Sequence, residues 1–340
     1  MLRLHGFRYH RPRELGEALA LLEEHSGDVL PIAGGTDLIP NMKHRLFTPS
    51  HLVSLRGVSD LYGIELEGDD LSIGAAETLS TISRHPLVLE YAPSLARAAG
   101  LVAGPQLRNM GTLGGNVCLD TRCTYYNQTE FWRSALGYCL KKDGTVCHVT
   151  KVGRRCVAAH SADTPPALMT LGGTVELVSI EGARVVDLVD FFVADGVANT
   201  VRRPGELVTR VRVPLPPMGR VSSFRKLRQR NSIDFPLLNV AVAGELDEEG
   251  VVEDLRIVVS ALGSRPRYLS GVDKIAVGQR LTPEVIEAVA ERAYQQCRPL
   301  TNIVLDPEWR RAMVPVEVRR ALHELSGGAA TRSRGAAAAS

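Results

Sequence analysis

Four cysteines form a pattern that is suited to metal chemistry. Cys123, Cys139, Cys147 and Cys156 are separated by 15, 7 and 8 residues. Four thiolates are the ligand set of a cubane iron–sulfur cluster, and a zinc ion can bind the same set. The pattern lacks the C-x2-C pair that is common in structural zinc sites, and it therefore favours the cluster. A zinc ion and four unligated thiols are the alternatives.

Basic side chains are in excess around these cysteines. Between Thr121 and His160, seven basic residues stand against two acidic ones. The seven are Arg122, Arg133, Lys141, Lys142, Lys151, Arg154 and Arg155. Such an excess would offset the negative charge of a four-thiolate cluster and raise its reduction potential. The alternatives are a solvated face and a docking surface for an acidic electron carrier such as ferredoxin.

Two glycine-rich loops have the composition of anion-binding turns. The first has the sequence AGGTDL over residues 33–38 and follows a predicted buried strand, and the second has the sequence NMGTLGGN over residues 109–116. Glycines allow backbone N–H groups to approach an anion closely, and a threonine hydroxyl adds a donor. Two such loops could hold the two phosphates of a dinucleotide from opposite sides. The alternative is that each loop is a tight turn between packed elements.

The elements that must position these residues are predicted from hydrophobic periodicity. Leu15, Ala18, Leu19 and Leu22, for example, follow helical spacing. Strands are expected over residues 29–33, 52–55, 64–67, 71–74, 174–180, 185–188, 221–228, 238–246 and 251–260. Helices are expected over residues 13–25, 78–84, 87–99, 283–296 and 307–325, with the last split at Pro315. The segment from 118 to 156 shows no clear element.

Composition excludes several classes of protein. The chain has 340 residues, of which 44% are hydrophobic and 23% are charged, as is typical of a soluble globular protein with two or three units. A net charge of +2 does not indicate a basic surface for binding nucleic acid. No apolar run reaches the ~18–20 residues of a membrane span, and the charged N-terminus lacks the apolar stretch of a signal peptide. We therefore expect a cytoplasmic protein that binds neither nucleic acid nor membrane. Motifs of P-loop proteins and of common hydrolases are absent.

The two loops at this spacing resemble those of the FAD-binding subunits of molybdenum hydroxylases. That family includes the flavin subunits of xanthine, aldehyde and carbon monoxide dehydrogenases. The resemblance extends to about Leu325 and includes residues 161–168 and 224–228. One departure is Gly111, where the family usually has alanine, and this change should leave the backbone donors in place.

The resemblance implies a noncovalent FAD and no catalytic residue in this chain. The pyrophosphate would lie between residues 34–38 and 112–116, and Asp163 would bind the ribose or adenine side. Leu207 and Lys226 would line the flavin. The FAD site implied in this way consists of Ala33, Gly34, Gly35, Thr36, Asp37, Leu38, Asn109, Thr112, Gly114, Gly115, Asn116, Asp163, Leu207 and Lys226.

The resemblance also implies an α+β fold of the FAD-binding (PCMH) type with three units. A small N-terminal α/β unit covers residues 1–60. A middle unit with a mixed or antiparallel sheet covers 61–216 and carries an insert at about 118–160. A C-terminal unit with an antiparallel sheet and helices covers 217–325, and residues 326–340 are expected to form a flexible tail.

The insert, including CLDTRCTYYNQ over residues 118–128, resembles that of the 4-hydroxybenzoyl-CoA reductase branch of the family. In that branch an extra loop holds a 4Fe–4S cluster, so the resemblance implies Cys123, Cys139, Cys147 and Cys156 as ligands. It further implies a molybdopterin-binding large subunit, a 2Fe–2S small subunit and a heterohexamer formed as a dimer of heterotrimers. Reduced ferredoxin would donate electrons, which would pass through 4Fe–4S, FAD, 2Fe–2S and molybdenum to remove the ring hydroxyl and give benzoyl-CoA.

Two other functions are compatible with the sequence. One is the FAD subunit of an oxidising hydroxylase of the aldehyde, xanthine or carbon monoxide dehydrogenase type, and the four-cysteine insert argues against it. The other is a non-catalytic module in which zinc staples the insert as a partner-binding surface. Cys118 and Cys297 are left over and are expected to be packed side chains.

Overall fold

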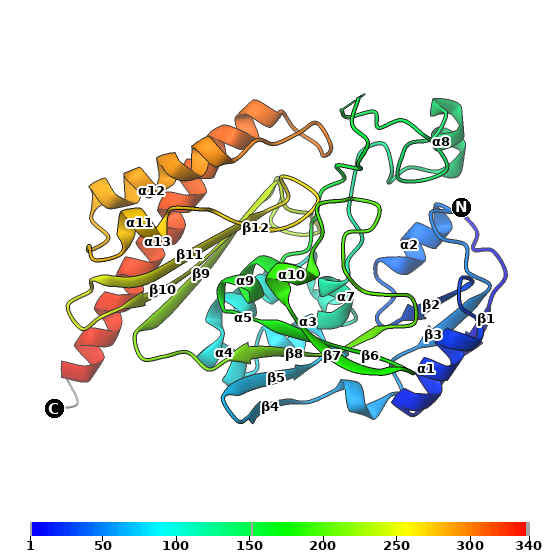
Figure 1. The fold of residues 1–340 in the computed structure, drawn as a ribbon, viewed down its shortest axis with the longest axis horizontal. Helices are drawn as coiled ribbons and strands as arrows, with labels where there is room; N and C mark the ends of the chain where they lie inside the picture. The colour runs from blue at the N-terminus through cyan, green and yellow to red at the C-terminus, as the bar shows by residue number, and fades with distance from the viewer. Residues whose placement is uncertain (1, 151, 338–340) are drawn as a thin grey trace.

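Three β-sheets follow one another along the chain, and helices pack around them (Figure 1). The structure, a computed structural model, describes residues 2–150 and 152–337. The first sheet has three parallel strands, the second has five antiparallel strands and the third has four antiparallel strands. The expected α+β fold is confirmed.

The N-terminal sheet has the order β1-β3-β2, with strands at Arg8–His10, His51–Ser54 and Val29–Ile32. Its strands are parallel, and helix α1 (Leu15–Glu24) makes the crossover between β1 and β2. Helix α1 buries Ala18, Leu19 and Leu22, which are the positions that the helical spacing predicted. Strand β2 ends at the first glycine loop, and helix α2 (Leu38–Lys43) begins directly after that loop.

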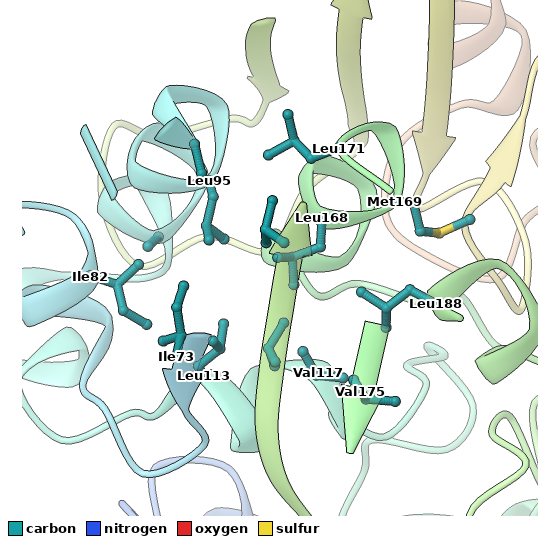
Figure 2. Packing of buried hydrophobic residues seen from close by; sticks show 14 of the residues in the cluster. Ile73, Ile82, Leu95, Leu113, Val117, Leu168, Met169, Leu171, Val175 and Leu188 are labelled. Atoms are coloured by element: carbon teal, nitrogen blue, oxygen red, sulfur yellow. The ribbon is translucent and has the colours of Figure 1, made fainter. Parts of the chain in front are cut away.

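The middle sheet has the order β4-β5-β8-β6-β7. Its strands cover Ile64–Glu67, Asp70–Gly74, Leu207–Pro214, Thr174–Ser179 and Gly182–Asp187, respectively. The helices around it are η1 (Ser59–Leu61), α3 (Leu79–Ile82), α4 (Pro86–Tyr91), α5 (Pro93–Leu101), α6 (Pro105–Arg108), α7 (Leu113–Val117), α9 (Thr164–Thr170) and α10 (Leu188–Phe191). Figure 2 shows the core that forms between them, in which Ile73, Leu95, Leu113, Leu168 and Val175 are completely buried.

The central strand β8 was not predicted. In the second half of the strand, valines alternate with Arg210 and Arg212. In the structure Arg212 forms ion pairs with Glu176 on the neighbouring strand β6 and with Glu67 on β4, which lies beyond β5. Cross-strand charge pairing therefore accounts for a strand that hydrophobicity alone did not reveal.

The C-terminal sheet has the order β12-β11-β10-β9, with strands at Arg267–Tyr268, Val252–Ser260, Leu238–Leu246 and Arg220–Leu227. Helices α11 (Asp273–Ala276), α12 (Pro283–Gln296) and α13 (Pro307–Ala337) lie along one side of this sheet (Figure 1). No helix of the described residues has both the length and the apolarity needed to cross a bilayer.

Two expectations about α13 were wrong. The helix continues through Pro315 without a break, because the buried residues Val314, Val318 and Leu322 hold both halves against the sheet. The segment from residue 326, which was expected to be a flexible tail, is helical as far as Ala337. Residues 338–340 lie outside the described residues.

The cysteine-rich insert leaves and rejoins the fold at one place. The backbone N–H of Arg122 donates to Ala159 O at 2.8 Å, and the N–H of Ala159 donates to Arg122 O at 2.6 Å. The insert contains helix α8 (Glu130–Leu136), which was not predicted, with Thr129 as its N-cap. It rises above the N-terminal unit in Figure 1.

Helix α8 is attached to the N-terminal unit through one buried arginine. The Arg133 side chain is 1% exposed, and its Nη2 donates to His44 O at 3.2 Å and to Arg45 O at 3.1 Å. These carbonyls lie at the C-terminal end of α2, where a positive charge is favourable. Helix α2 is therefore in contact with the first glycine loop at one end and with the insert at the other.

Candidate functional site

A cavity of about 670 Å³ contains most of the residues that were expected to bind FAD. This volume lies within the range of small-molecule sites. The expected residues that line it are Ala33, Gly34, Gly35, Thr36, Asp37, Leu38, Thr112, Gly114, Gly115, Asn116, Asp163 and Leu207. Asn109 and Lys226 do not line it. Strands, helix ends and loops of all three sheets contribute, so the cavity depends on the complete fold.

The first glycine loop offers free donors. Within the described part of the chain, the backbone N–H groups of Gly34, Gly35 and Thr36 meet no acceptor. Gly35 has a φ of 70°, a conformation that favours glycine. A Cβ on Gly34 would lie 1.8 Å from Met110 O, so the two loops pack backbone against backbone. Three free amides at the end of a strand form an anion-binding concavity.

The second loop differs from the first, because its amides are already used. Leu113 N donates to Glu77 O, Gly114 N to Ala75 O, Gly115 N to Thr112 Oγ1 and Asn116 N to Thr112 O, at 2.8 to 3.2 Å. This loop therefore contributes shape and side chains. The Asn116 Oδ1 accepts from Thr164, which leaves its Nδ2 as the available donor to the cavity among the described contacts.

Ser161 and Arg122 also line the cavity, although sequence reasoning did not assign them to it. The Ser161 hydroxyl is buried and has no partner among the described residues. Arg122 forms an ion pair with Asp37 and lies 4.5 Å from the centre of the Phe235 ring. Burial lowers the pKa of Arg122 to about 10. An unpaired hydroxyl and a half-satisfied guanidinium are groups that a polar, anionic ligand could satisfy.

Lys226 supports the site indirectly. Its Nζ donates to Asp163 Oδ2 at 2.6 Å and to Leu101 O at 3.1 Å, and Asn239 Nδ2 donates to Asp163 Oδ1 at 3.0 Å. Burial raises the pKa of Asp163, and Lys226 opposes that rise. Asp163 is the member of this network that reaches the cavity, and Lys226 fixes its position.

Lys226→Met should lower the free energy of unfolding by ~3–5 kcal/mol, because it leaves the Asp163 carboxylate buried without its charged partner. Urea denaturation of the flavin-free protein would measure this loss. The double variant Lys226→Met/Asp163→Asn serves as the control and should recover a large part of the stability. A single variant as stable as the wild type would show that the pair is not a buried ion pair.

The four cysteines of the insert surround a second, smaller cavity. Their side chains are between 6% and 9% exposed, and each is a free thiol. Tyr126, Lys141 and His148 also line this cavity. Burial raises the pKa of Cys123 and raises that of Cys156 to about 11, so a metal that binds here must displace protons.

The arrangement of the four sulfurs bears on which metal could bind. Tetrahedral zinc with Zn–S bonds of about 2.3 Å requires sulfurs about 3.8 Å apart. In the described part of the chain, no three of these cysteines have their sulfurs all within 4.8 Å of one another. The residues that do form such a close group of possible metal ligands are His10, His25 and His51. A single tetrahedral zinc ion would therefore require the sulfurs to move closer together. In a cubane each thiolate binds a different iron atom, so wider spacing is compatible with it.

The basic residues around the cysteines are not all part of a surface. Arg122, Arg133 and Lys141 point inward and are paired with acidic or carbonyl oxygens. Arg154 and Arg155 are exposed, and Lys151 lies outside the described residues. The expectation of a solvated face or a docking surface therefore applies only to the exposed part of the set.

Known proteins resemble this chain over nearly its whole length. The family described as "FAD binding domain in molybdopterin dehydrogenase" matches residues 5–216, and "CO dehydrogenase flavoprotein C-terminal domain" matches residues 222–325. The carbon monoxide dehydrogenase medium chain of Afipia carboxidovorans is 30% identical over 93% of this chain and 96% of its own length. The aldehyde oxidoreductase FAD-binding subunit PaoB of Escherichia coli is 32% identical over 79% of this chain and 85% of its own.

Solved structures agree with these relatives. A structure of Cu,Mo-CO dehydrogenase superimposes with a TM-score of 0.78 at 30% identity and covers 96% of this chain and 99% of that chain. Quinoline 2-oxidoreductase from Pseudomonas putida 86 gives a TM-score of 0.79 at 25% identity, with the same coverage. The first family match alone covers more than half of the residues. The chain belongs to the FAD-binding subunits of the molybdenum hydroxylase family, whose members are oxidoreductase subunits of molybdenum enzyme complexes.

Proposed function

We propose that this chain is the FAD and 4Fe–4S electron-transfer subunit of a 4-hydroxybenzoyl-CoA reductase. Reduced ferredoxin would supply single electrons to a cluster held by Cys123, Cys139, Cys147 and Cys156. The electrons would then pass through FAD to a 2Fe–2S subunit and a molybdenum subunit. The observation that carries this proposal is the convergence of the four buried cysteines on one cavity next to the flavin cavity.

The residues of the larger cavity fit FAD. The free amides of residues 34–36 suit the pyrophosphate, and the unpartnered groups of Ser161 and Asn116 suit the polar part of the dinucleotide. When bound, FAD accepts two electrons and releases them singly, which connects one-electron centres. Leu207 and the apolar side chains around it would exclude water from a flavin ring bound beside them.

The proposed reaction requires two electrons, which arrive one at a time. Removal of the ring hydroxyl consumes two electrons and two protons and gives benzoyl-CoA and water. The acyl-CoA pocket would lie on the molybdenum subunit, and this chain would carry out no bond chemistry on the substrate. We further propose a cytoplasmic heterohexamer built as a dimer of heterotrimers.

A second candidate function is an oxidising hydroxylase, in which electrons would leave through FAD to NAD or a quinone. The relatives favour it, because they include a carbon monoxide dehydrogenase medium chain and an aldehyde oxidoreductase FAD-binding subunit. Under this alternative the insert would hold zinc or no metal.

One experiment tests these alternatives together. The contents of iron, acid-labile sulfide, zinc and flavin are measured in the protein purified without oxygen. About four iron atoms and four sulfides per FAD, with flavin reduction by reduced ferredoxin, are expected for the reductase. Flavin without iron or sulfide would contradict the proposal and favour the oxidising hydroxylase. A protein with zinc and no flavin would instead indicate a zinc-stapled binding module.

A further inference from the structure

We propose that the ion pair between Lys141 and Asp120 is the electrostatic link between the four-cysteine site and the flavin cavity. In this arrangement the Lys141 ammonium raises the reduction potential of the metal centre. The inference rests on the proposed function, because it requires a redox-active centre at the cysteines. Lys141 is one of the seven basic residues that were expected together to raise this potential; the inference assigns the effect to its ammonium group and gives a role to Asp120, which had none.

Lys141 is held rigidly beside the cysteines. It lines the four-cysteine cavity, its side chain is 5% exposed, and it follows Cys139 by two residues. Its Nζ donates to Asp120 Oδ1 at 2.7 Å, to Thr121 Oγ1 at 2.8 Å and to Gly196 O. All three ammonium protons are thus used, and the charge has a fixed position. The Nζ also lies 4.7 Å from the centre of the Tyr126 ring, which covers it on another side.

Asp120 is the member of the pair that reaches the flavin cavity. It lines that cavity, and its side chain is 24% exposed. Its Oδ2 accepts from the Tyr126 hydroxyl at 3.0 Å, and its Oδ1 accepts from Thr121 N at 2.9 Å. Cys123, which lines the smaller cavity, follows Asp120 by three residues, so a short stretch of backbone connects the two cavities.

Gly196 closes the space between the two sites. A Cβ at this position would lie 2.7 Å from Cys156 Sγ, and the backbone N–H of Gly196 donates to Cys156 O at 2.8 Å. Its carbonyl accepts from Lys141, and the next residue, Val197, lines the flavin cavity. The Lys141 ammonium is therefore surrounded by protein, where a charge acts more strongly than it does in water, whereas Asp120 faces the flavin cavity.

The two members of the pair should act on the potential with opposite signs. An added electron makes the four-thiolate site one unit more negative, so a nearby cation favours reduction and a nearby anion opposes it. Removal of the lysine charge should lower the potential of the metal centre. Removal of the aspartate charge should raise it. A purely structural role gives no reason for opposite shifts.

Four variants of the complete enzyme complex test this inference. They are Lys141→Met, Lys141→Arg, Asp120→Asn and the neighbouring control Lys142→Met, whose side chain is 35% exposed and does not line the four-cysteine cavity. Iron, sulfide and flavin contents are measured first for each variant. A redox titration then follows the reduced cluster by electron paramagnetic resonance and the flavin by visible absorption.

We expect Lys141→Met to shift the cluster potential to more negative values and Asp120→Asn to shift it to more positive values. Lys141→Arg and Lys142→Met should stay close to the wild type. Asp120→Asn preserves the shape of the side chain, so it remains a valid test even if Lys141→Met fails to assemble the cluster. Equal potentials, or shifts of the same sign, in an iron-loaded protein would overturn this inference alone. A wild-type protein without iron would overturn the proposed function and this inference with it.

Discussion

Cys139→Ser should remove the metal centre and leave FAD in place. The side chain is buried among the other three cysteines, and a serine hydroxyl is a much poorer ligand of iron than a thiolate. Iron and sulfide should fall from about four per FAD to near zero, whereas flavin content should not change, because Cys139 does not line the flavin cavity. Ferredoxin-driven reduction of the substrate should be lost.

Cys297→Ala is the matched control. This cysteine is also buried, but it lies at the end of α12 in the core of the C-terminal unit, away from the other five. Its variant should retain iron, sulfide and flavin. If Cys139→Ser lost its cluster and still accepted electrons from ferredoxin, the four-cysteine site would not be the point where electrons arrive.

Gly34→Ala should abolish most FAD binding. The added Cβ would overlap with Met110 O, which belongs to the backbone of the other glycine loop and cannot rotate away. The two loops would have to separate, and the free amides of residues 34–36 would lose their position. We expect FAD affinity to fall at least about tenfold, or ~1.4 kcal/mol in binding free energy. Flavin content after gel filtration and fluorescence titration with FAD would measure the loss.

Gly111→Ala is the corresponding control in the second loop. A Cβ there would lie 3.1 Å from Leu107 O and 3.4 Å from Leu79 Cδ1, so a small shift accommodates it. This variant should keep its FAD. Equal loss from both variants would mean that flavin binding does not depend on the contact between Gly34 and Met110.

The sequence indicated the parts of the site that depend on local composition. Paired glycines after a strand pointed to the first loop, and the spacing of the four cysteines pointed to the insert, because both patterns can be seen in the sequence without knowledge of the fold. Resemblance to the family supplied Asp163 and Leu207, which composition did not single out.

The missed features depend on contacts between distant parts of the chain. Nothing in the sequence distinguishes Gly196 from the other glycines, and its role follows from its contact with Cys156 in the fold. The Ser161 hydroxyl is likewise seen to be buried without a hydrogen-bond partner only when the described residues around it are in place. Lys226 was expected at the flavin, yet the structure pairs it with Asp163 from a different unit. Local patterns carry no information about such pairings.

The two hydrogen bonds between Arg122 and Ala159 have a consequence for how this subunit arose. A segment whose ends already lie side by side can be added to an existing protein without moving the elements on either side, and a longer loop adds only slowly to the entropy of closure. A flavoprotein of this family could thus have gained the four-cysteine segment by a single insertion.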